Sequence, residues 1–284
     1  MYDSILIPVD GSAPAKRAVG YGSLLAEAYD AELVLLHALA GGTGGSDADR
    51  ERGERVLSAA RELVDGGVPV ETRLVEGVPH RAVVDHVADA DVDLVVMGRR
   101  GRTGLGEGLL GSVTERVLVR VSVPVVVVPR GAAPVPDGLS TVLLPTDGSE
   151  NAEAASGHAA DLVGRFGAAL HVVNVVDVQS AGGLFSAGGV SEEFVDRLDR
   201  AGTEAVERMV AAVHEADPDL DPASAVVHGT PHEGIRDYVR EHDVDLVAMG
   251  SRGRSNLERQ LFGNVTKRVL RVVDVPVLVV GREA

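Results

Sequence analysis

Short apolar runs alternate with longer amphipathic stretches along the first half of the chain. The apolar runs are rich in Val, Leu and Ile and have the length of ordinary strands, and the stretches between them repeat apolar residues with a helical period. Strands that are apolar throughout indicate a sheet covered by helices on both faces. The pattern predicts strands at residues 4–9, 32–38, 69–75, 93–97 and 124–128, and helices at residues 13–29, 47–65, 80–89 and 112–121.

The same pattern occurs a second time. Ile5–Ser12 (ILIPVDGS) reappears as Val142–Ser149 (VLLPTDGS), and Val123–Val128 (VPVVVV) reappears as Val275–Val280 (VPVLVV). The two copies are 137 residues apart at the first pair and 152 at the second, so the second copy holds an insertion, which we place near residues 177–190. Self-similarity of this kind indicates tandem copies of one structural unit.

Alternation of strands and helices predicts an α/β protein with two tandem domains. Each domain is expected to be a doubly wound, Rossmann-like, five-stranded parallel sheet with right-handed crossovers. We place the first domain at residues 1–130, a linker rich in Pro and Gly at 131–138, and the second domain at 139–284.

Composition narrows the choice of partners and compartment. The chain has 284 residues, a formal net charge of −16, 3% aromatic residues and no Trp or Cys. Nucleic acids and anionic membranes are bound through Lys and Arg, so this charge argues against both partners. The absence of Cys excludes disulfides, thiolate catalysis and Cys-ligated zinc. We expect a cytoplasmic protein, whose acidic, Lys-poor composition is similar to that of proteins from salt-loving organisms.

Each copy carries one glycine-spaced loop after its fourth strand. The spacing G-x2-G-x9-G is formed by Gly98, Gly101 and Gly111 in the first copy, and by Gly250, Gly253 and Gly263 in the second. Glycine lets backbone N–H groups approach an anion, and the helix predicted after the loop presents further N–H donors with a partial positive charge. The chain contains no G-x-x-x-x-G-K-[ST] loop, and no G-x-G-x-x-G dinucleotide fingerprint follows its first strand.

Polar and cationic side chains accompany these glycines. Ser112 or Asn264, together with Thr114 or Thr266, would add side-chain donors for a phosphate. Arginines gather in both loops, at Arg99, Arg100, Arg102, Arg252, Arg254 and Arg259. Local cations in an acidic chain favour a polyphosphate ligand.

The G-x2-G-x9-G-[ST] pattern, following a strand that ends in Pro-x-Asp-x-Ser, resembles the ATP-binding members of the universal stress protein family. The resemblance covers nearly the whole chain, twice. It implies the strand order 3-2-1-4-5, a fold similar to that of adenine-nucleotide α-hydrolases, with the ends of the first and fourth strands adjacent at the point where ligands bind. Asp10 would then face Gly98, and Asp147 would face Gly250.

The resemblance also implies which residues contact an adenine nucleotide. In the first copy these are Pro8, Val9, Asp10 and Ala38 for the base and ribose, and Met97, Gly98, Gly101, Gly111, Ser112, Val113 and Thr114 for the ribose and phosphates. The matching residues of the second copy are Pro145, Thr146, Asp147, Val175, Met249, Gly250, Gly253, Gly263, Asn264, Val265 and Thr266. Asn264 departs from the usual Ser or Thr, which puts occupancy of the second site in doubt.

Simpler roles remain open for several of these residues. Asp10 and Asp147 could only cap the following helix, and the glycines could be ordinary turn residues. Met97 and Met249 could only pack in the core, and the loop arginines could form a solvated face. For the repeated His80 and His232 we expect a structural or solvent role, and no spacing in the chain indicates a metal site or a catalytic triad.

These observations favour a regulatory stress protein that binds ATP, ADP or AMP, with or without Mg²⁺, and hydrolyses it slowly at most. One alternative is a scaffold or chaperone-like protein without a nucleotide. Another is an adenylating or ATP-splitting enzyme, although its usual Ser-Gly-Gly-x-Asp-Ser or His-x-Gly-His motif is absent. The apolar last strands would lie at sheet edges that need covering, which predicts an intramolecular pseudo-dimer and allows a homodimer. The sequence identifies no regulatory protein partner.

Overall fold

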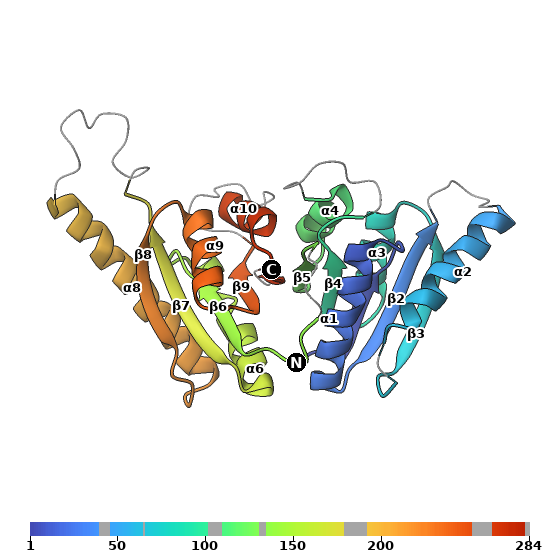
Figure 1. The fold of residues 1–284 in the computed structure, drawn as a ribbon, viewed down its shortest axis with the longest axis horizontal. Helices are drawn as coiled ribbons and strands as arrows, with labels where there is room; N and C mark the ends of the chain where they lie inside the picture. The colour runs from blue at the N-terminus through green and yellow to red at the C-terminus, as the bar shows by residue number, and fades with distance from the viewer. Residues whose placement is uncertain are drawn as a thin grey trace. The chain divides into compact units, whose positions relative to one another are not determined.

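The computed structural model describes residues 1–39, 46–64, 66–101, 110–130, 135–178, 192–251 and 263–281. Both repeats alternate strands and helices, as the sequence predicts (Figure 1). No helix in the described part of the chain is long and apolar enough to cross a membrane.

The first repeat contains five strands and four helices among the described residues. Its strands are β1 (Ser4–Pro8), β2 (Glu32–Leu39), β3 (Val70–Glu76), β4 (Leu94–Gly98) and β5 (Val125–Val128). Its helices are α1 (Ala13–Tyr29), α2 (Asp47–Arg61), α3 (Pro79–Asp89) and α4 (Ser112–Arg120). Helix α2 ends before the predicted position near residue 65, ahead of the pair Gly66 and Gly67, which are poor helix formers.

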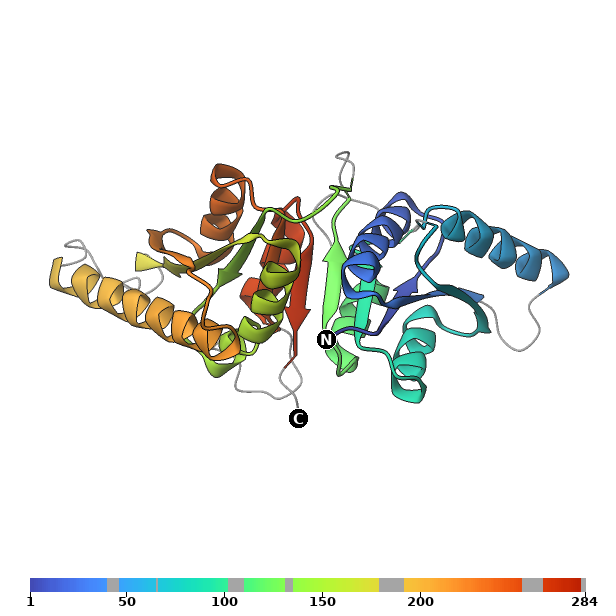
Figure 2. The same cartoon turned by 90° about the horizontal axis from the view of Figure 1, so that it is seen from below.

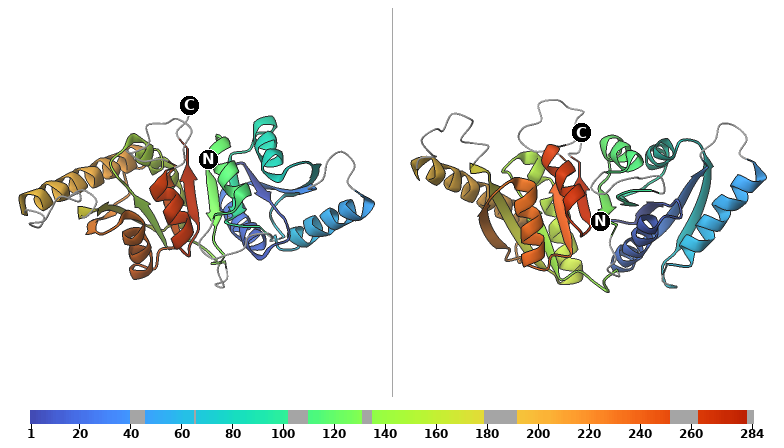
Figure 3. Two further views of the ribbon diagram at one scale, coloured as in Figure 1. Left: turned by 90° about the horizontal axis from the view of Figure 1, so that it is seen from above. Right: turned by 45° about the horizontal axis from the view of Figure 1, so that its top comes forward.

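The second repeat follows the same order of elements. Its strands are β6 (Thr141–Pro145), β7 (Ala169–Val176), β8 (Ala223–His228), β9 (Leu246–Gly250) and β10 (Val277–Val280). Its helices are α5 (Glu150–Glu153), α6 (Ser156–Phe166), α8 (Glu192–Ala216), α9 (Pro231–Glu241) and α10 (Asn264–Val272). Helix α8 has 25 residues, whereas its counterpart α2 has 15 (Figure 3).

The strand order is β3-β2-β1-β4-β5 in the first repeat and β8-β7-β6-β9-β10 in the second, which confirms the predicted order 3-2-1-4-5. The neighbouring strands β1 to β5 pair in parallel, as do β6 with β7 and β9, and β7 with β8. Helices α1 and α2 cover one face of the first sheet and α3 the other, while α6 and α8 lie opposite α9 in the second (Figure 2). Strands β1 and β4 are therefore buried between helices, with Ile5, Leu6 and Leu94 at 0% exposure.

Internal contacts divide the chain into two compact units. The first contains residues 1–138 together with 274–279, and the second contains residues 139–273 with 280–284. Within the first unit, β10 pairs antiparallel with β5, and Leu278 lies opposite Val126. The domain limits predicted at residues 130 and 139 remain predictions.

The extra residues of the second repeat are added in two places. A Cβ on Gly53 of α2 would lie 3.0 Å from the His37 side chain, and a Cβ on Gly202 of α8 would lie 2.8 Å from the Asn174 side chain. Because His37 and Asn174 occupy the same place in the two repeats, Gly53 and Gly202 are equivalent. His37 and Asn174 are 137 residues apart, but Gly53 and Gly202 are 149 apart, and the offset reaches 152 only later. The single insertion predicted near residues 177–190 thus accounts for twelve of the fifteen extra residues, and three more follow Gly202.

Candidate functional site

The chain turns sharply where β1 ends. Val9 continues the strand, since its N–H donates to Leu36 O at 2.8 Å, and Gly11 then takes the left-handed conformation with φ +79°. Asp10 Oδ1 accepts the Ser12 N–H at 2.9 Å, and Ser12 Oγ accepts the Ala15 N–H at the start of α1. The residue that caps α1 is therefore Ser12, and the alternative that Asp10 caps it is wrong: Asp10 holds the turn before the helix.

Two glycines of the first loop fit tightly beside this turn. A Cβ on Gly98 would lie 2.8 Å from Pro14 Cβ and 2.9 Å from Pro14 C, so the first turn of α1 packs directly on the end of β4. A Cβ on Gly101 would lie 2.5 Å from Asp10 Oδ2. The structure therefore brings together the ends of β1 and β4, as the strand order predicts, and places Gly101 against the Asp10 carboxylate.

The third glycine begins helix α4. The Gly111 N–H donates to Arg99 O at 2.9 Å, which closes the loop, and a Cβ on Gly111 would lie 3.1 Å from the same oxygen. The first intrahelical bond runs from Glu115 N to Gly111 O, and no side chain caps the helix. The N–H groups of the first turn thus have no intrahelical acceptor, and they carry the positive end of the helix dipole. The glycines are therefore close-contact positions and not ordinary turn residues.

Thr114 has a different part from the one predicted. Its side chain is buried at 2% exposure, and its Oγ1 donates to Gly98 O at 3.0 Å. A hydroxyl has one proton, so Thr114 ties α4 to the end of β4 and does not donate to a phosphate. Thr266 does the same in the second repeat, where its Oγ1 donates to Gly250 O at 3.0 Å. Ser112 is exposed at the helix start, and its role as a phosphate donor stays a prediction.

The remaining predicted residues of the first site differ in accessibility. Met97 is buried at 4% exposure and pairs with Val127 inside the sheet, which is the core-packing role left open above. Val9 is also buried, whereas three others are half-buried: Pro8, Ala38 and Val113. Ala38 lies near the end of β2, one residue past His37.

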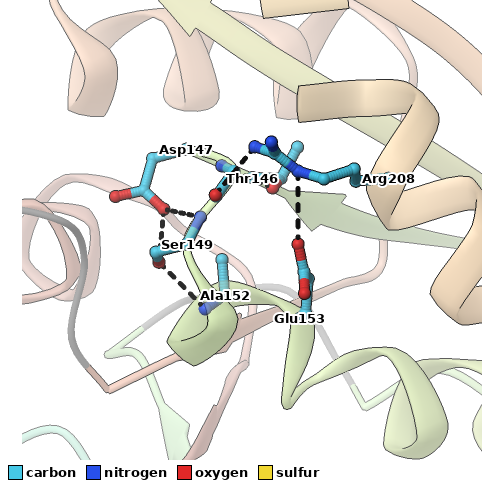
Figure 4. Close-up of polar contacts among 7 residues, drawn as sticks. Thr146, Asp147, Ser149, Ala152, Glu153 and Arg208 are labelled. Atoms are coloured by element: carbon cyan, nitrogen blue, oxygen red, sulfur yellow. Dashed lines mark hydrogen bonds and ion pairs between the residues drawn. The ribbon is translucent and has the colours of Figure 1, made fainter. Parts of the chain in front are cut away.

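The second repeat reproduces the turn with a denser set of polar contacts (Figure 4). Asp147 Oδ1 accepts from both Ser149 N and Ser149 Oγ, at 3.1 and 2.6 Å, and Gly148 has φ +70°. Ser149 Oγ in turn caps α5 by accepting the Ala152 N–H. As in the first repeat, the cap is the serine, so the capping alternative for Asp147 is also wrong, although Asp147 is more exposed than Asp10.

The second loop is described at its two ends. A Cβ on Gly250 would overlap Asn151 O, a tighter approach than at Gly98. Gly263 N donates to Ser251 O at 2.9 Å and begins α10 without a side-chain cap. Asn264 and Val265 are exposed at the helix start.

The other predicted residues of the second repeat follow their counterparts. Pro145 and Thr146 are buried at the end of β6, Val175 is half-buried in β7, and Met249 is buried at 6% in β9. Five predicted residues lie outside the described part of the chain: Gly253, Arg102, Arg252, Arg254 and Arg259.

A pair of residues that the sequence did not single out supports the two turns. The Nδ1 of His37 lies 2.6 Å from Val9 O, so this nitrogen carries the proton that the carbonyl accepts. At the equivalent place, Asn174 Nδ2 donates to Thr146 O at 2.8 Å. The sequence offers little signal for this equivalence, because His and Asn are different residue types that meet the same need for a donor.

The charge at the first loop comes from Arg99 and Arg100 among the described residues. Burial lowers the pKa of Arg99, Asp274 opposes this effect and Arg100 adds to it. An arginine remains protonated at neutral pH in such surroundings, so the loop keeps its positive charge. The described residues contain no group of three or more His, Cys, Asp and Glu that could hold a metal ion.

A model of the Universal stress protein family matches residues 1–129 and 138–281. The chain belongs to this family. A universal stress protein of Mycobacterium tuberculosis is 30% identical over 296 residues, which cover 97% of this chain and 96% of the relative. A universal stress protein of Methanocaldococcus jannaschii is 33% identical over 156 residues, which cover 46% of this chain and 96% of the relative.

A solved structure supports the fold. The crystal structure of a universal stress protein from Archaeoglobus fulgidus superposes with a TM-score of 0.73 at 24% identity, covering 98% of each chain. Universal stress proteins thus occur both as a tandem chain of this length and as a chain that matches about half of it.

Proposed function

We propose that this universal stress protein binds an adenine nucleotide, first of all ATP, and serves stress regulation with at most slow hydrolysis. The observation that carries the proposal is the pair of close contacts that hold an uncapped helix start beside the end of β1. Gly101 lies against Asp10, and Gly111 closes on Arg99 O immediately before α4. This combination leaves backbone donors at the switch point of a doubly wound sheet, where anionic ligands bind.

The residues around this point suit the parts of a nucleotide. The first-turn N–H groups of α4 and the Ser112 hydroxyl would hold phosphates, with Arg99 supplying positive charge. Asp10 would accept hydrogen bonds from ribose hydroxyls. The apolar Val9 and Ala38 would border the base. Any Mg²⁺ would be brought by the nucleotide phosphates, since such ions bind largely through substrate phosphates.

We propose that the second repeat binds the same ligand more weakly. Among the described residues, the close approach at Gly250, the bond from Gly263 N to Ser251 O and the uncapped start of α10 match their counterparts in the first repeat. Asn264 replaces Ser112, and its amide is a longer donor than a hydroxyl. An Asn264→Ser variant is expected to tighten the weaker of two nucleotide sites by up to about tenfold, the worth of one hydrogen bond.

Titration calorimetry with ATP and Mg²⁺ tests the main proposal. The Gly111→Val variant places a side chain against Arg99 O and should abolish binding to the first site. Gly66→Val is the matched control, because a Cβ at Gly66 meets no atom within 4 Å. Unchanged ATP binding by Gly111→Val, or no binding by the wild type, would overturn the proposal and leave the scaffold or chaperone-like alternative.

Parallel titrations with ADP, AMP and cyclic AMP identify the preferred phosphate. If the α4 start holds the phosphate chain, ATP should bind best. Phosphate release measured under saturating ATP separates slow hydrolysis from an ATP-splitting enzyme, which would turn over on the scale of about 1–10³ s⁻¹. No observation on the structure favours the adenylating enzyme.

We also propose that the repeats form an intramolecular pseudo-dimer through their last strands. The support is that β10, from the second repeat, pairs antiparallel with β5, and that residues 274–279 belong to the first compact unit. The chain has no cysteine, so a Val126→Cys, Leu278→Cys variant tests this directly. A disulfide within a single chain is expected, and its absence under oxidising conditions would contradict the arrangement. Sedimentation of the wild type tests for a homodimer.

A further inference from the structure

A cavity of about 270 Å³ lies in the first repeat between α1 and α2. It is lined by Lys16 and Val19 on α1 and by Arg52, Arg55, Ala59 and Ala60 on α2. It contains none of the glycine-loop residues of β4 and α4, and it shares only Val9 with the proposed nucleotide site. The cavity is therefore a separate feature of the first repeat.

The lining combines an apolar floor with three cations. Val9, Ala15, Val19 and Ala60 are buried at 0–6% exposure. The cations are Lys16 on α1 and Arg52 and Arg55 on α2. The two arginines pair with exposed carboxylates of their own helix at 3.5 Å, and exposed pairs of this kind hold an arginine only weakly. Three weakly committed cations around an apolar floor are complementary to an anion with an apolar body.

Two lining positions on α2 carry larger side chains in the second repeat. Because Gly53 and Gly202 are equivalent, Ala59 corresponds to Arg208 and Ala60 corresponds to Met209. Met209 is completely buried. At these two positions the alanines of α2 take up less space than the larger residues of α8.

Charge is reversed at the same place. Lys16 corresponds to Glu153, which lies 3.6 Å from Arg208 Nε, and Arg208 also donates to Gly148 O at 2.8 Å (Figure 4). Arg208 thus lies between α8 and the turn after β6, beside the place that corresponds to the cavity. In the first repeat the glycine of this turn, Gly11, instead faces Val56 across the cavity lining.

We propose that this cavity binds a small amphipathic carboxylate, with its chain on the apolar floor and its head group between Lys16, Arg52 and Arg55. A volume of about 270 Å³ equals that of about nine water molecules at about 30 Å³ each. The cavity therefore suits a ligand of about ten non-hydrogen atoms, the size of octanoate. It lies just below the usual range of ligand pockets, about 300–1,000 Å³. The proposal does not depend on nucleotide binding.

Titration of the full chain with sodium octanoate tests the proposal, with 1-octanol as the neutral ligand of equal chain length. One octanoate is expected to bind per chain. Octanol should bind at least fivefold more weakly, because it lacks the negative charge. Octanoate should also bind at least fivefold more weakly in 0.5 M salt, because salt screens the attraction between exposed charges. Equal binding of octanol, or no binding of octanoate, would overturn the proposal.

Variants locate the site. The double variant Lys16→Glu, Ala59→Arg reproduces the ion pair of the second repeat and should weaken octanoate binding at least tenfold. Arg61→Glu, a charge reversal on the same helix outside the lining, should leave it unchanged. Lys16→Gln, which introduces no bulk, should weaken it about threefold, the scale of one exposed charge. Unchanged octanoate binding in both Lys16 variants would overturn the assignment. The Gly111→Val variant should still bind octanoate, because Gly111 is not part of the cavity lining. Octanoate binding by this variant therefore distinguishes failure of the nucleotide proposal from failure of this one.

Discussion

The two repeats build the turn after their first strand from the same types of residue, but they differ in the side chains between the helices beside that turn. In both, an aspartate holds the turn, a serine caps the next helix and a threonine ties the fourth strand to the following helix. Behind the turn, the first repeat has a cavity, and the second has Met209 with the Arg208–Glu153 pair. Backbone geometry at the loop tolerates little change, whereas space between helices is set by side chains that can differ from one copy to the next.

The largest effect is expected where the loops approach the backbone most closely. A methyl group at Gly250 would overlap Asn151 O, a backbone atom held by α5, so Gly250→Ala should destabilise the protein by about 3 kcal/mol or more. Gly98→Ala meets Pro14 at longer distances and should cost about 1–2 kcal/mol.

Urea denaturation followed by circular dichroism measures both changes. Gly164→Ala is the control, because its site inside α6 is open and alanine should stabilise the helix by about 0.5–1 kcal/mol. Similar losses for Gly250→Ala and Gly164→Ala would contradict the close approach.

Exchanging the groove residues sharpens the comparison further. Met209→Ala should destabilise the second repeat by about 2–3 kcal/mol, because it removes a fully buried side chain and leaves a cavity. Ala60→Met should cost the first repeat less than about 1 kcal/mol, because its side chain can enter the existing cavity. The same denaturation measurement compares the two variants, and equal losses would show that the grooves do not differ in free space.

The supporting donors should be interchangeable. His37→Asn keeps a donor for Val9 O and should change stability by less than about 0.5 kcal/mol, whereas His37→Leu leaves that carbonyl without this donor and should cost about 1–2 kcal/mol. Asn174→Leu should have a comparable cost, because Asn174 is buried and donates to Thr146 O. Thermal denaturation of the three variants checks this, and a His37→Asn loss as large as that of His37→Leu would refute the equivalence.

The smallest effect concerns pH. In the second repeat, His171 Nδ1 lies 3.1 Å from the Tyr238 hydroxyl oxygen. The pKa of His171 is lowered below 6.5, mainly by burial and to a smaller extent by the nearby His242. A lowered pKa in the folded state means that the unfolded chain binds the proton first. The stability from neutral His171 is therefore complete above about pH 6.5 and is lost as pH falls through the lower folded value.

The first repeat offers the matched residue, Val34, at the position of His171. His171→Val should flatten the fall in stability below pH 6.5, measured by urea denaturation at several pH values. A fall as steep as in the wild type would assign the pH dependence to other groups.

Much of the fold could be predicted because its signals are local. Runs rich in apolar residues predicted the strands of the first repeat within about two residues. Gly98, Gly101, Gly111 and Gly250 mark backbone positions where a Cβ has little room. Gly101 and Gly111 were identified by spacing alone, and the structure shows the contacts that require glycine there. Alternating strands and helices, together with the family resemblance, led to the correct strand order.

Other features escaped because they depend on which atoms meet after folding. Thr114 was expected to donate outward, but the carbonyl of Gly98 takes its only proton. His37 and Asn174 look unrelated in sequence because either residue can supply the same donor.

By itself the sequence determined the two tandem repeats, their α/β elements and the glycine spacing of both loops, because hydrophobic period and the steric limits of glycine act over a few residues. Only the tertiary structure decided that the serines are the helix caps and that the threonines point inward. It also decided that equivalent residues of α2 and α8 are 149 residues apart, three fewer than the 152 that separate the later parts of the repeats. That alignment determines which side chains face the groove. The cavity beside α2 exists because small residues from two separate helices meet there, and no local pattern records the space left between them.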